Sequence, residues 1–318
     1  MPPSVLGAPS ATSAAIIGGG TMGADVAVVL LRARCHVSIV EPRLDQHDAI
    51  RARVTSNLNA IDCADNASLL KLEADSDQLE WPGIGLVIEC VPENLDLKQR
   101  VFRDLARKAT PAAVLASNSS SFPISEIIQD CPGPERMLGL HFFMPAHIVP
   151  LVEVVMGPRT DARVADAMAA FMRRCGSVPI MVRKDVPGFI ANRLQHALGR
   201  EAYSLIAEGI ANPEDIDAAV RFGFGFRYLA AGPIMQKEHA GLDVHASAAA
   251  TIYPSLSNVS TPPAVLADKP KQGKTGMKSG EGFYKWDEGS IREEKERYDR
   301  ALRAGLKILA EDLPKIEP

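Results

Sequence analysis

The sequence predicts an α/β fold in which a doubly wound parallel sheet is followed by an all-helical C-terminal domain. Three features indicate this. Short apolar runs alternate with helical stretches through the first half of the chain. A glycine-rich turn, GGGTMG, joins the first apolar run to the first helix. From Lys184 onward strand patterns largely vanish and long helical patterns replace them. We therefore expect a flexible tail over residues 1–12, an α/β domain over 13–183 and a helical domain over 184–318.

The elements of the α/β domain follow from the spacing of apolar residues. The first helix is expected over Thr21–Ala33, and another over Asp161–Cys175, where Val164, Met168 and Phe171 share one face. Strands interleaved with helices predict a parallel sheet covered on both faces. The expected strands are Ala14–Ile17, His36–Val40, Leu86–Cys90, Ala113–Ser117, Met137–His141, Leu151–Val155 and Val178–Val182.

The helical domain begins with a stretch, DVPGFIANRLQHALGREAYSLIAEG, that predicts a helix of about five turns after a Pro-Gly entry. The next helix is expected to begin with Asn212 as N-cap and Pro213 at the first helical position. Near the chain end, apolar residues at helical spacing predict a stripe that packs on this chain or on a second subunit. The stripe consists of Ile291, Tyr298, Leu302, Leu306 and Leu309.

Composition excludes several classes of protein. The 318 residues carry a formal net charge of −4, so no basic field attracts nucleic acid or anionic lipid. The apolar stretches are too short for a membrane span, and the first residues lack the features of a signal peptide. Five scattered cysteines without a CxxC pair indicate buried thiols in a reducing cytoplasm and predict neither disulfides nor a metal site.

Gly18, Gly20 and Gly23 form G-x-G-x-x-G between a strand and a helix, which is typical of a Rossmann-type dinucleotide site. The pyrophosphate is expected at the helix N-terminus, against Gly18, Gly20, Thr21, Met22 and Gly23. Glu41 closes the next strand, 18 residues past Gly23, where a carboxylate binds the ribose hydroxyls and repels a 2′-phosphate. NAD is therefore the expected cofactor, with nearby Arg43 as the one feature that would suit NADP.

The catalytic group is expected at the end of the fifth expected strand. His141 ends that strand, and Glu153 lies 12 residues later in the next one, so a strand return could bring imidazole and carboxylate together. The run SNSSS, residues 117–121, supplies hydroxyl and amide donors at the carboxyl edge of the sheet. His147 is a rival base in a less fixed loop position.

Several stretches, taken in order, resemble the 3-hydroxyacyl-CoA dehydrogenase superfamily over about residues 13–286: G-x-G-x-x-G, ECVPENLDLK, ASNSSS, HFF-P, PLVEVV, DVPGFIANRL and GKTGMKSGEGFYKW. The resemblance implies oxidation of a 3-hydroxy group to a ketone with NAD, and a homodimer formed through the C-terminal domain. It implies His141 as general base, Glu153 as its partner, and Ser120 and Asn192 as polar groups around the reacting oxygen. It also places Glu93, Lys98 and Asn118 on the nicotinamide-ribose side. For Lys98 the alternative is an exposed helix face.

Three departures concern the substrate. Met144 stands where the superfamily has asparagine, and a thioether cannot donate hydrogen bonds. The segment between Glu41 and Leu86 is shorter and less basic than the lysine-rich helical hairpin of acyl-CoA members, with Arg51, Arg53 and Lys71 left to meet phosphate. GFGFRYLAAGP resembles the gulonate dehydrogenase and lambda-crystallin branch, in which Arg227 could hold a substrate carboxylate.

The sequence therefore favours a small polar 3-hydroxy acid as substrate, with a 3-hydroxyacyl-CoA as the alternative, since GKTGMKSGEGFYKW is typical of acyl-CoA members. An alternative of another class is a non-catalytic, crystallin-like NAD-binding protein. A decarboxylating oxidation is disfavoured because GFIANRL offers no lysine base.

Overall fold

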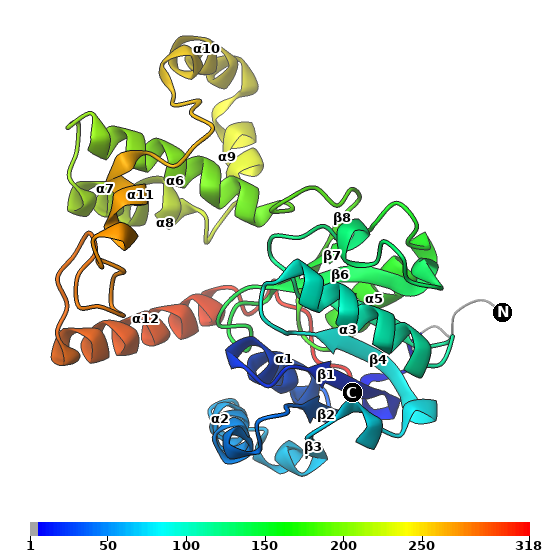
Figure 1. Cartoon of the computed structure of the whole chain (residues 1–318). Coiled ribbons are helices and arrows are strands. Elements are labelled where there is room, and N and C mark those ends of the chain that lie inside the picture. Colours follow the sequence, from blue (N-terminus) through cyan, green and yellow to red (C-terminus); the bar gives the residue numbers. More distant parts are fainter. Residues whose placement is uncertain (1–5) are drawn as a thin grey trace. The chain divides into compact units, whose positions relative to one another are not determined.

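The computed structural model describes residues 6–318, which divide into two compact units (Figure 1). The α/β unit comprises the described residues up to Arg193 together with Asp312–Pro318, and the helical unit comprises Leu194–Glu311. The division thus lies later than the boundary expected at Lys184, because the Pro-Gly segment and the first residues of the long helix pack with the α/β unit. The last seven residues also return to it, and the amide of Glu317 donates to the carbonyl of Arg174 (2.9 Å).

The α/β unit is built on a sheet of eight strands in the order β3-β2-β1-β4-β5-β6-β7-β8. Neighbouring strands are parallel except β6 and β7, which are antiparallel. The chain order reverses between β1 and β4, and ligands of doubly wound folds bind at such a point, outside the carboxyl ends of the strands. The strands are β1 (Ser13–Ile17), β2 (His36–Val40), β3 (Leu70–Glu73), β4 (Ile84–Glu89), β5 (Val114–Ser117), β6 (Met137–Phe142), β7 (Leu151–Val155) and β8 (Val178–Val182).

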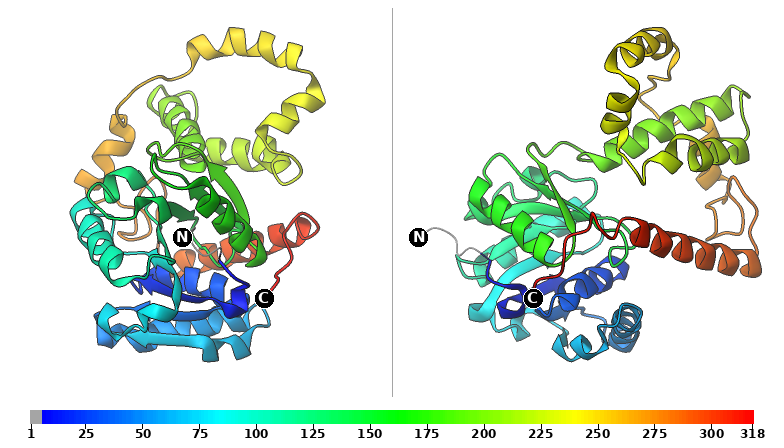
Figure 2. Two further views of the ribbon diagram at one scale, coloured as in Figure 1. Left: turned by 90° about the vertical axis from the view of Figure 1, so that its right-hand side faces the viewer. Right: turned by 180° about the vertical axis from the view of Figure 1, so that it is seen from behind.

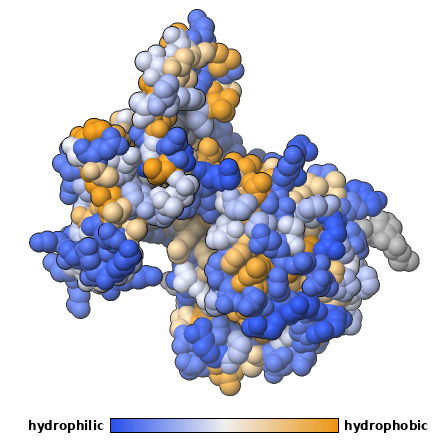
Figure 3. Space-filling model, turned by 45° about the horizontal axis from the view of Figure 1, so that its top comes forward, coloured by the Kyte–Doolittle hydropathy of each residue, from blue (hydrophilic) through white to orange (hydrophobic). Residues whose placement is uncertain are grey.

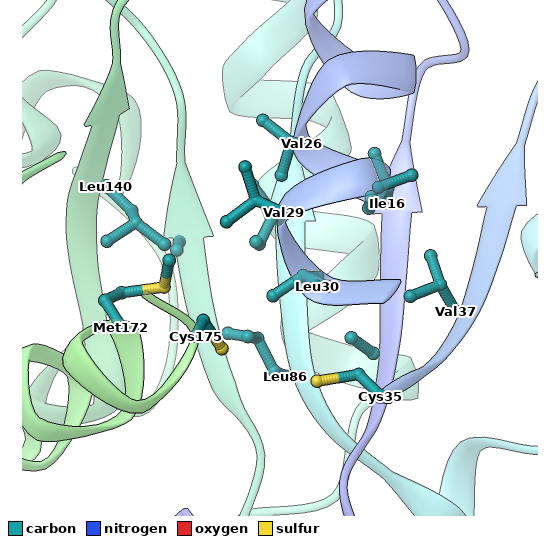
Figure 4. Packing of buried hydrophobic residues seen from close by; sticks show 14 of the residues in the cluster. Ile16, Val26, Val29, Leu30, Cys35, Val37, Leu86, Leu140, Met172 and Cys175 are labelled. Carbon is teal, nitrogen blue, oxygen red and sulfur yellow. The ribbon is translucent and has the colours of Figure 1, made fainter. Parts of the chain in front are cut away.

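Helices cover both faces of this sheet because alternate residues of each strand point to opposite sides. Ala14 and Ile16 pack with α1 (Thr21–Arg32), α2 (His47–Asn59) and α5 (Ala162–Arg174) in one core layer, part of which Figure 4 shows. Ala15 and Ile17 pack with α3 (Leu95–Lys108) and α4 (Ile124–Ile127) in the other. The predicted sheet covered on both faces is confirmed.

Two parts of the α/β unit differ from the expectation. β3 was not predicted, because its sequence, LKLE, is short and half charged, and it pairs only with β2 at the edge of the sheet. The flexible tail expected over residues 1–12 lies, for residues 1–5, outside the described part of the chain. Residues 6–12 are packed: Leu6 is buried, and Arg174 donates to the carbonyl of Gly7 (2.8 Å).

The helical unit begins within α6 (Ala191–Ala207), which starts later than the Pro-Gly stretch suggested because Gly188 and Phe189 take positive φ values of 77° and 49°. Asn212 caps the next helix through the amide of Asp215, as predicted. None of the helices in residues 6–318 is long and apolar enough to cross a membrane. The remaining helices are α7 (Pro213–Ala219), α8 (Gly225–Arg227), α9 (Pro233–Ala240), α10 (Leu242–Ile252), α11 (Ala264–Lys271) and α12 (Glu288–Ile308).

Candidate active site

The glycine turn after β1 is fixed by steric demands at two positions and open at the third. Gly18 has φ +108°, and a Cβ there would lie 2.8 Å from the carbonyl oxygen of Cys90. A Cβ on Gly23 would overlap the carbonyl oxygen of Gly18. A Cβ on Gly20, by contrast, would meet nothing within 4 Å. The turn therefore packs tightly against β4 and leaves free space above Gly20, beside Thr21 and Met22 at the N-terminus of α1, as a bound pyrophosphate requires.

Glu41 lies directly after β2, with 5% of its surface exposed. One carboxylate oxygen accepts from the amide of Gly19 (3.1 Å), and the other accepts from Nε of Arg43 (2.8 Å). The hydrogen bond from Arg43 is the main cause that holds the pKa of Glu41 below its usual value. Glu41 is therefore ionised near pH 7 at the position where the adenosine ribose of a dinucleotide lies.

His141 lies at the centre of a series of three hydrogen-bonded side chains. Its Nδ1 lies 2.7 Å from Oε2 of Glu153, and its Nε2 lies 3.0 Å from the hydroxyl of Ser120. The contact between His141 and Glu153 expected from the sequence is thus present, and the two residues are direct partners across the antiparallel strands β6 and β7. His141 and Glu153 are buried.

Glu153 also binds backbone groups through its second oxygen, which accepts from the amides of Ile190 (3.0 Å) and Ala191 (2.9 Å) at the start of α6. Burial acts to raise the pKa of Glu153, but the hydrogen bonds from His141 and from the two amides outweigh it and hold that pKa below its usual value. An ionised carboxylate fixes the imidazole with its proton on Nδ1, which leaves Nε2 free to accept a proton.

Two aromatic rings limit the movement of the imidazole. Phe143 meets it edge-on, with ring centroids 4.5 Å apart, and the centroid of Phe189 lies 5.5 Å away. Phe189 is buried despite its positive φ, which is costly for an aromatic residue and is maintained here by the surrounding packing. The geometry of His141 is therefore set by packing as well as by hydrogen bonds.

A cluster of charged side chains, formed by Lys98, Glu89 and Glu93, lies next to the serine run and contacts the backbone of Ser120. The ammonium of Lys98 contacts Glu89 (2.9 Å) and Glu93 (3.2 Å), and Ser117 donates to Glu89 (2.6 Å). The side chain of Lys98 is only 1% exposed, so the alternative of an exposed helix face is wrong, and its ammonium is enclosed by protein groups. Lys98 therefore holds the carboxylates of Glu89 and Glu93 in place from a position that is closed to solvent.

Glu93 links Lys98 to the serine run, residues 117–121, by hydrogen bonds. Its Oε1 accepts from the hydroxyl of Ser119 (2.6 Å) and from the amides of Ser120 (3.2 Å) and Ser121 (2.9 Å). Burial acts to raise the pKa of Glu93, but the bonds from Ser119 and Lys98 lower it below the usual value. Sequence reasoning missed Glu89, and it included Ser117 and Ser119 only as members of the run SNSSS, without separate roles. The signal for Glu89 was a carboxylate that ends an apolar strand.

The remaining residues that the sequence singled out lie in different parts of the structure. Asn118 accepts from the amide of Phe142 (2.9 Å), and Asn192 lies in the first turn of α6, next to Ala191. The side chain of Met144 is exposed, and Arg227 lies on α8 in the helical unit. His147, the rival base, lies with Nδ1 3.2 Å from Asp25, and the two atoms are not aligned for a hydrogen bond. His147 therefore belongs to a different cluster from Ser120.

Comparison with known proteins agrees with this geometry. The model described as the NAD-binding domain of 3-hydroxyacyl-CoA dehydrogenase matches residues 13–186, and the model of the C-terminal domain matches residues 188–286. The chain is 37% identical over 237 residues to a 3-hydroxyacyl-CoA dehydrogenase of Gibberella moniliformis, which covers 69% of this chain and 70% of that protein.

A second relative is named for a different activity. The chain is 33% identical over 275 residues to 5-formyl-3-hydroxy-2-methylpyridine 4-carboxylate 5-dehydrogenase of Mesorhizobium japonicum, with 85% of this chain and 89% of that protein covered. A crystal structure of an enzyme of that name, described as an NAD+-dependent dismutase, superposes with a TM-score of 0.88 at 32% identity over 94% of this chain and 98% of that one. The open space at Gly20 and the ionised Glu41 fit NAD. The chain belongs to the 3-hydroxyacyl-CoA dehydrogenase family and is an NAD-dependent oxidoreductase.

Proposed function

We propose that this protein oxidises a hydroxyl group of a small carboxylate substrate to a carbonyl group, with His141 as general base. The observation that carries the proposal is the hydrogen-bonded series Ser120–His141–Glu153, which lies at the carboxyl edge of the sheet that also forms the glycine turn. A 3-hydroxy acid, oxidised to the 3-keto acid, is the substrate that the family resemblance favours.

Each residue of the series has a separate task. Glu153 holds the proton of His141 on Nδ1, so the lone pair of Nε2 faces the position of the substrate hydroxyl and accepts its proton. In the structure the hydroxyl of Ser120 donates to Nε2, and we propose that a bound substrate hydroxyl takes its place there, which frees Ser120 to donate to the same substrate oxygen. NAD, when bound at the glycine turn, supplies the acceptor for hydride from the substrate carbon.

Asn192 is proposed as a further polar contact to the substrate. It follows Ala191, whose amide is bound to Glu153, so the carboxylate that orients His141 also fixes the backbone next to Asn192. A shift in this carboxylate would therefore displace both the base and the amide side chain.

The segment between β2 and β4 supports a small substrate. It forms α2, a 3-10 helix over Ala64–Leu69 and the edge strand β3, so the residues hold a single α-helix where a hairpin would need two. Arg43 pairs with Glu41, and Arg53 donates two hydrogen bonds to Asp25 (2.9 and 2.8 Å). Two basic side chains of this segment are thus already paired with carboxylates, which leaves few basic side chains to bind the phosphates of CoA. The Mesorhizobium relative, by its name, acts on a pyridine carboxylate without CoA.

The second candidate substrate is a 3-hydroxyacyl-CoA. Both family models carry that name, and so does the Gibberella relative. The expected His141 chemistry is the same for both substrates. Only the means of holding the distant part of the substrate differs.

NADH formation tests the proposal. Purified protein with NAD would be offered small 3-hydroxy acids and 3-hydroxyacyl-CoAs, and the absorbance of NADH followed. We expect turnover of a small carboxylate, with activity lost in His141→Ala while NADH binding is kept. His36→Ala is the matched control, because His36 is exposed at the start of β2. Activity of His141→Ala equal to wild type would overturn the role of the base, and turnover of CoA thioesters alone would overturn the substrate class.

A further inference from the structure

A pocket in the helical unit lies between α6 and the segment that leads into α11 (Figures 1 and 2, light green and orange). It has a volume of about 350 Å³, and every residue of its lining belongs to Leu194–Glu311. One part of the lining is a face of α6, where His196, Arg200 and Tyr203 follow one another at helical spacing. The other part is formed by residues 259–263 and the first turn of α11. The function proposed above makes no use of this pocket.

The charged side chains of the pocket are all basic. His196 and Arg200 are exposed, and the lining, all of which is described, contains no acidic residue. Neither side chain has a hydrogen-bond or ion-pair partner within residues 6–318. The hydroxyls of Ser260 and Thr261 line the same pocket and add donors. An arginine that has no carboxylate partner in its own chain is free to bind a carboxylate or phosphate from solution, with two parallel hydrogen bonds.

The beginning of α11 adds to the positive character of the pocket. Pro263, the N-cap of this helix, and Leu266, in its first turn, both line the pocket. Between them lie Ala264 and Val265, whose amides are the first two of the helix and have no intrahelical acceptor. No side chain of the described chain accepts from these amides either. The positive end of the helix dipole thus borders the pocket that contains Arg200.

Contacts outside the pocket hold the two parts of its lining in place. The carboxylate of Glu201, on α6, accepts from the amide of Ser257 (2.7 Å), which ties the segment before α11 to this helix. The ring of Tyr203 stacks on the ring of Phe283, with centroids 5.8 Å apart and planes at 17°. Glu201, which follows Arg200 in the sequence, is therefore engaged with backbone. A pocket whose walls are held before a ligand arrives loses less conformational entropy on binding.

Apolar groups make up the rest of the lining, and they include Val259 and Leu266. Figure 3 shows apolar patches beside hydrophilic ones on the visible face of the helical unit, so a mixed surface alone does not distinguish the pocket. The volume of the pocket falls in the range of small-molecule sites and exceeds what a simple inorganic ion fills. We propose that this pocket binds a small organic anion, whose carboxylate or phosphate group binds Arg200 and whose apolar body packs on Tyr203.

Isothermal titration calorimetry with three probes that share one ring tests the proposal: benzoate, phenyl phosphate and neutral benzyl alcohol. Saturating NADH occupies the dinucleotide site at the glycine turn, so the phosphate probe is excluded from it. We expect at least one anion to bind at least tenfold more tightly than benzyl alcohol, and the tighter anion identifies the head group. Arg200→Gln should weaken this binding about tenfold, because a charged hydrogen bond is lost. Arg292→Gln is the matched control, because Arg292 is exposed on α12 and does not line the pocket. Equal binding of all three probes, no binding of either anion, or unchanged affinity in Arg200→Gln would refute the proposal.

Nuclear magnetic resonance of labelled histidine rings locates the anion in the wild-type protein, which keeps the proposal testable if Arg200→Gln does not fold. The ring signal of His196, assigned with His196→Gln, should shift when the anion is added, and the signals of His239 and His245 should not, because neither lines the pocket. His141→Ala retains the whole pocket and should bind the anion as tightly as wild type, so failure of the proposed function leaves this result unchanged. Loss of binding in His141→Ala, or shifts at other histidines without one at His196, would place the anion elsewhere and contradict the assignment.

Discussion

His141 and Glu153 are opposite each other in the register of the antiparallel strands β6 and β7, and their side chains meet at 2.7 Å between Nδ1 and Oε2. The backbone pairing of the sheet thus brings the two side chains together, and the rings of Phe143 and Phe189 pack against the imidazole. Since side chains of directly opposed residues share one face of a sheet, imidazole and carboxylate meet without a long or flexible reach. Loss of the carboxylate should therefore affect the chemistry more than the fold.

Glu153→Gln is expected to lower kcat by about 100-fold or more, because one side-chain oxygen must serve both His141 and the amides of Ile190 and Ala191. The amide NH2 of glutamine would face a donor on one side or the other. The measurements are kcat with the substrate identified by NADH formation, and the dissociation constant of NADH from fluorescence, which should stay within a few-fold of wild type. Glu126→Gln, an exposed change on α4, is the control. A Glu153→Gln enzyme with normal kcat would contradict the assigned role.

Acid stability should depend on the same carboxylate. The folded-state pKa of Glu153 is lowered, so its ionised form stabilises the fold above its unfolded pKa of about 4.3, and this contribution is lost as pH falls through the lower folded pKa. We expect the difference in urea midpoint between wild type and Glu153→Gln to be full at pH 7 and to shrink below about pH 4. A difference that grows toward acid pH would show the opposite sign of linkage.

The parts of the site that depend on local spacing or on neighbouring strands could be predicted from sequence. Gly18 and Gly23 act within one turn, and His141 and Glu153 are joined by a strand return. Lys98 could not be placed in this way, because its burial depends on how α3 packs against the end of β4, where Glu89 lies. The pairing of Arg53 with Asp25 depends in the same way on the packing of α2 against α1.

Lys98→Met is expected to destabilise the protein by about 3–5 kcal/mol, because it leaves Glu89 buried without its charge partner. Urea unfolding of the α/β unit measures the loss. Lys108→Met is the matched control on the same helix, where the lysine pairs with partly exposed Asp77 and Asp104, and it should cost about 1 kcal/mol or less. Adding Glu89→Leu to Lys98→Met should recover part of the loss, and a further loss of similar size would argue against a coupled pair.

The glycine turn separates a steric role from a binding role. Gly20→Ala places a methyl group in open space, so we expect stability within about 0.5 kcal/mol of wild type and a dissociation constant for NAD raised at least tenfold. Gly23→Ala forces a Cβ into the carbonyl of Gly18 and should lower stability itself. Thermal unfolding with and without NADH distinguishes the two variants. Normal NAD affinity in Gly20→Ala would show that the cofactor does not approach this backbone.

Met144 directly follows Phe143, which packs on the ring of His141, and 65% of the surface of Met144 is exposed. Met144→Asn restores the residue of the family pattern and adds hydrogen-bond donors where the thioether has none. One gained hydrogen bond to a substrate thioester oxygen would raise kcat/KM for 3-hydroxyacyl-CoAs by up to about tenfold, with stability changed by no more than about 0.5 kcal/mol. Met144→Leu, similar in volume and without donors, should leave the ratio of kcat/KM between CoA thioesters and small hydroxy acids as it is in wild type. If the asparagine variant leaves that ratio unchanged too, position 144 has no part in the choice of substrate, and the short segment between β2 and β4 must account for it alone.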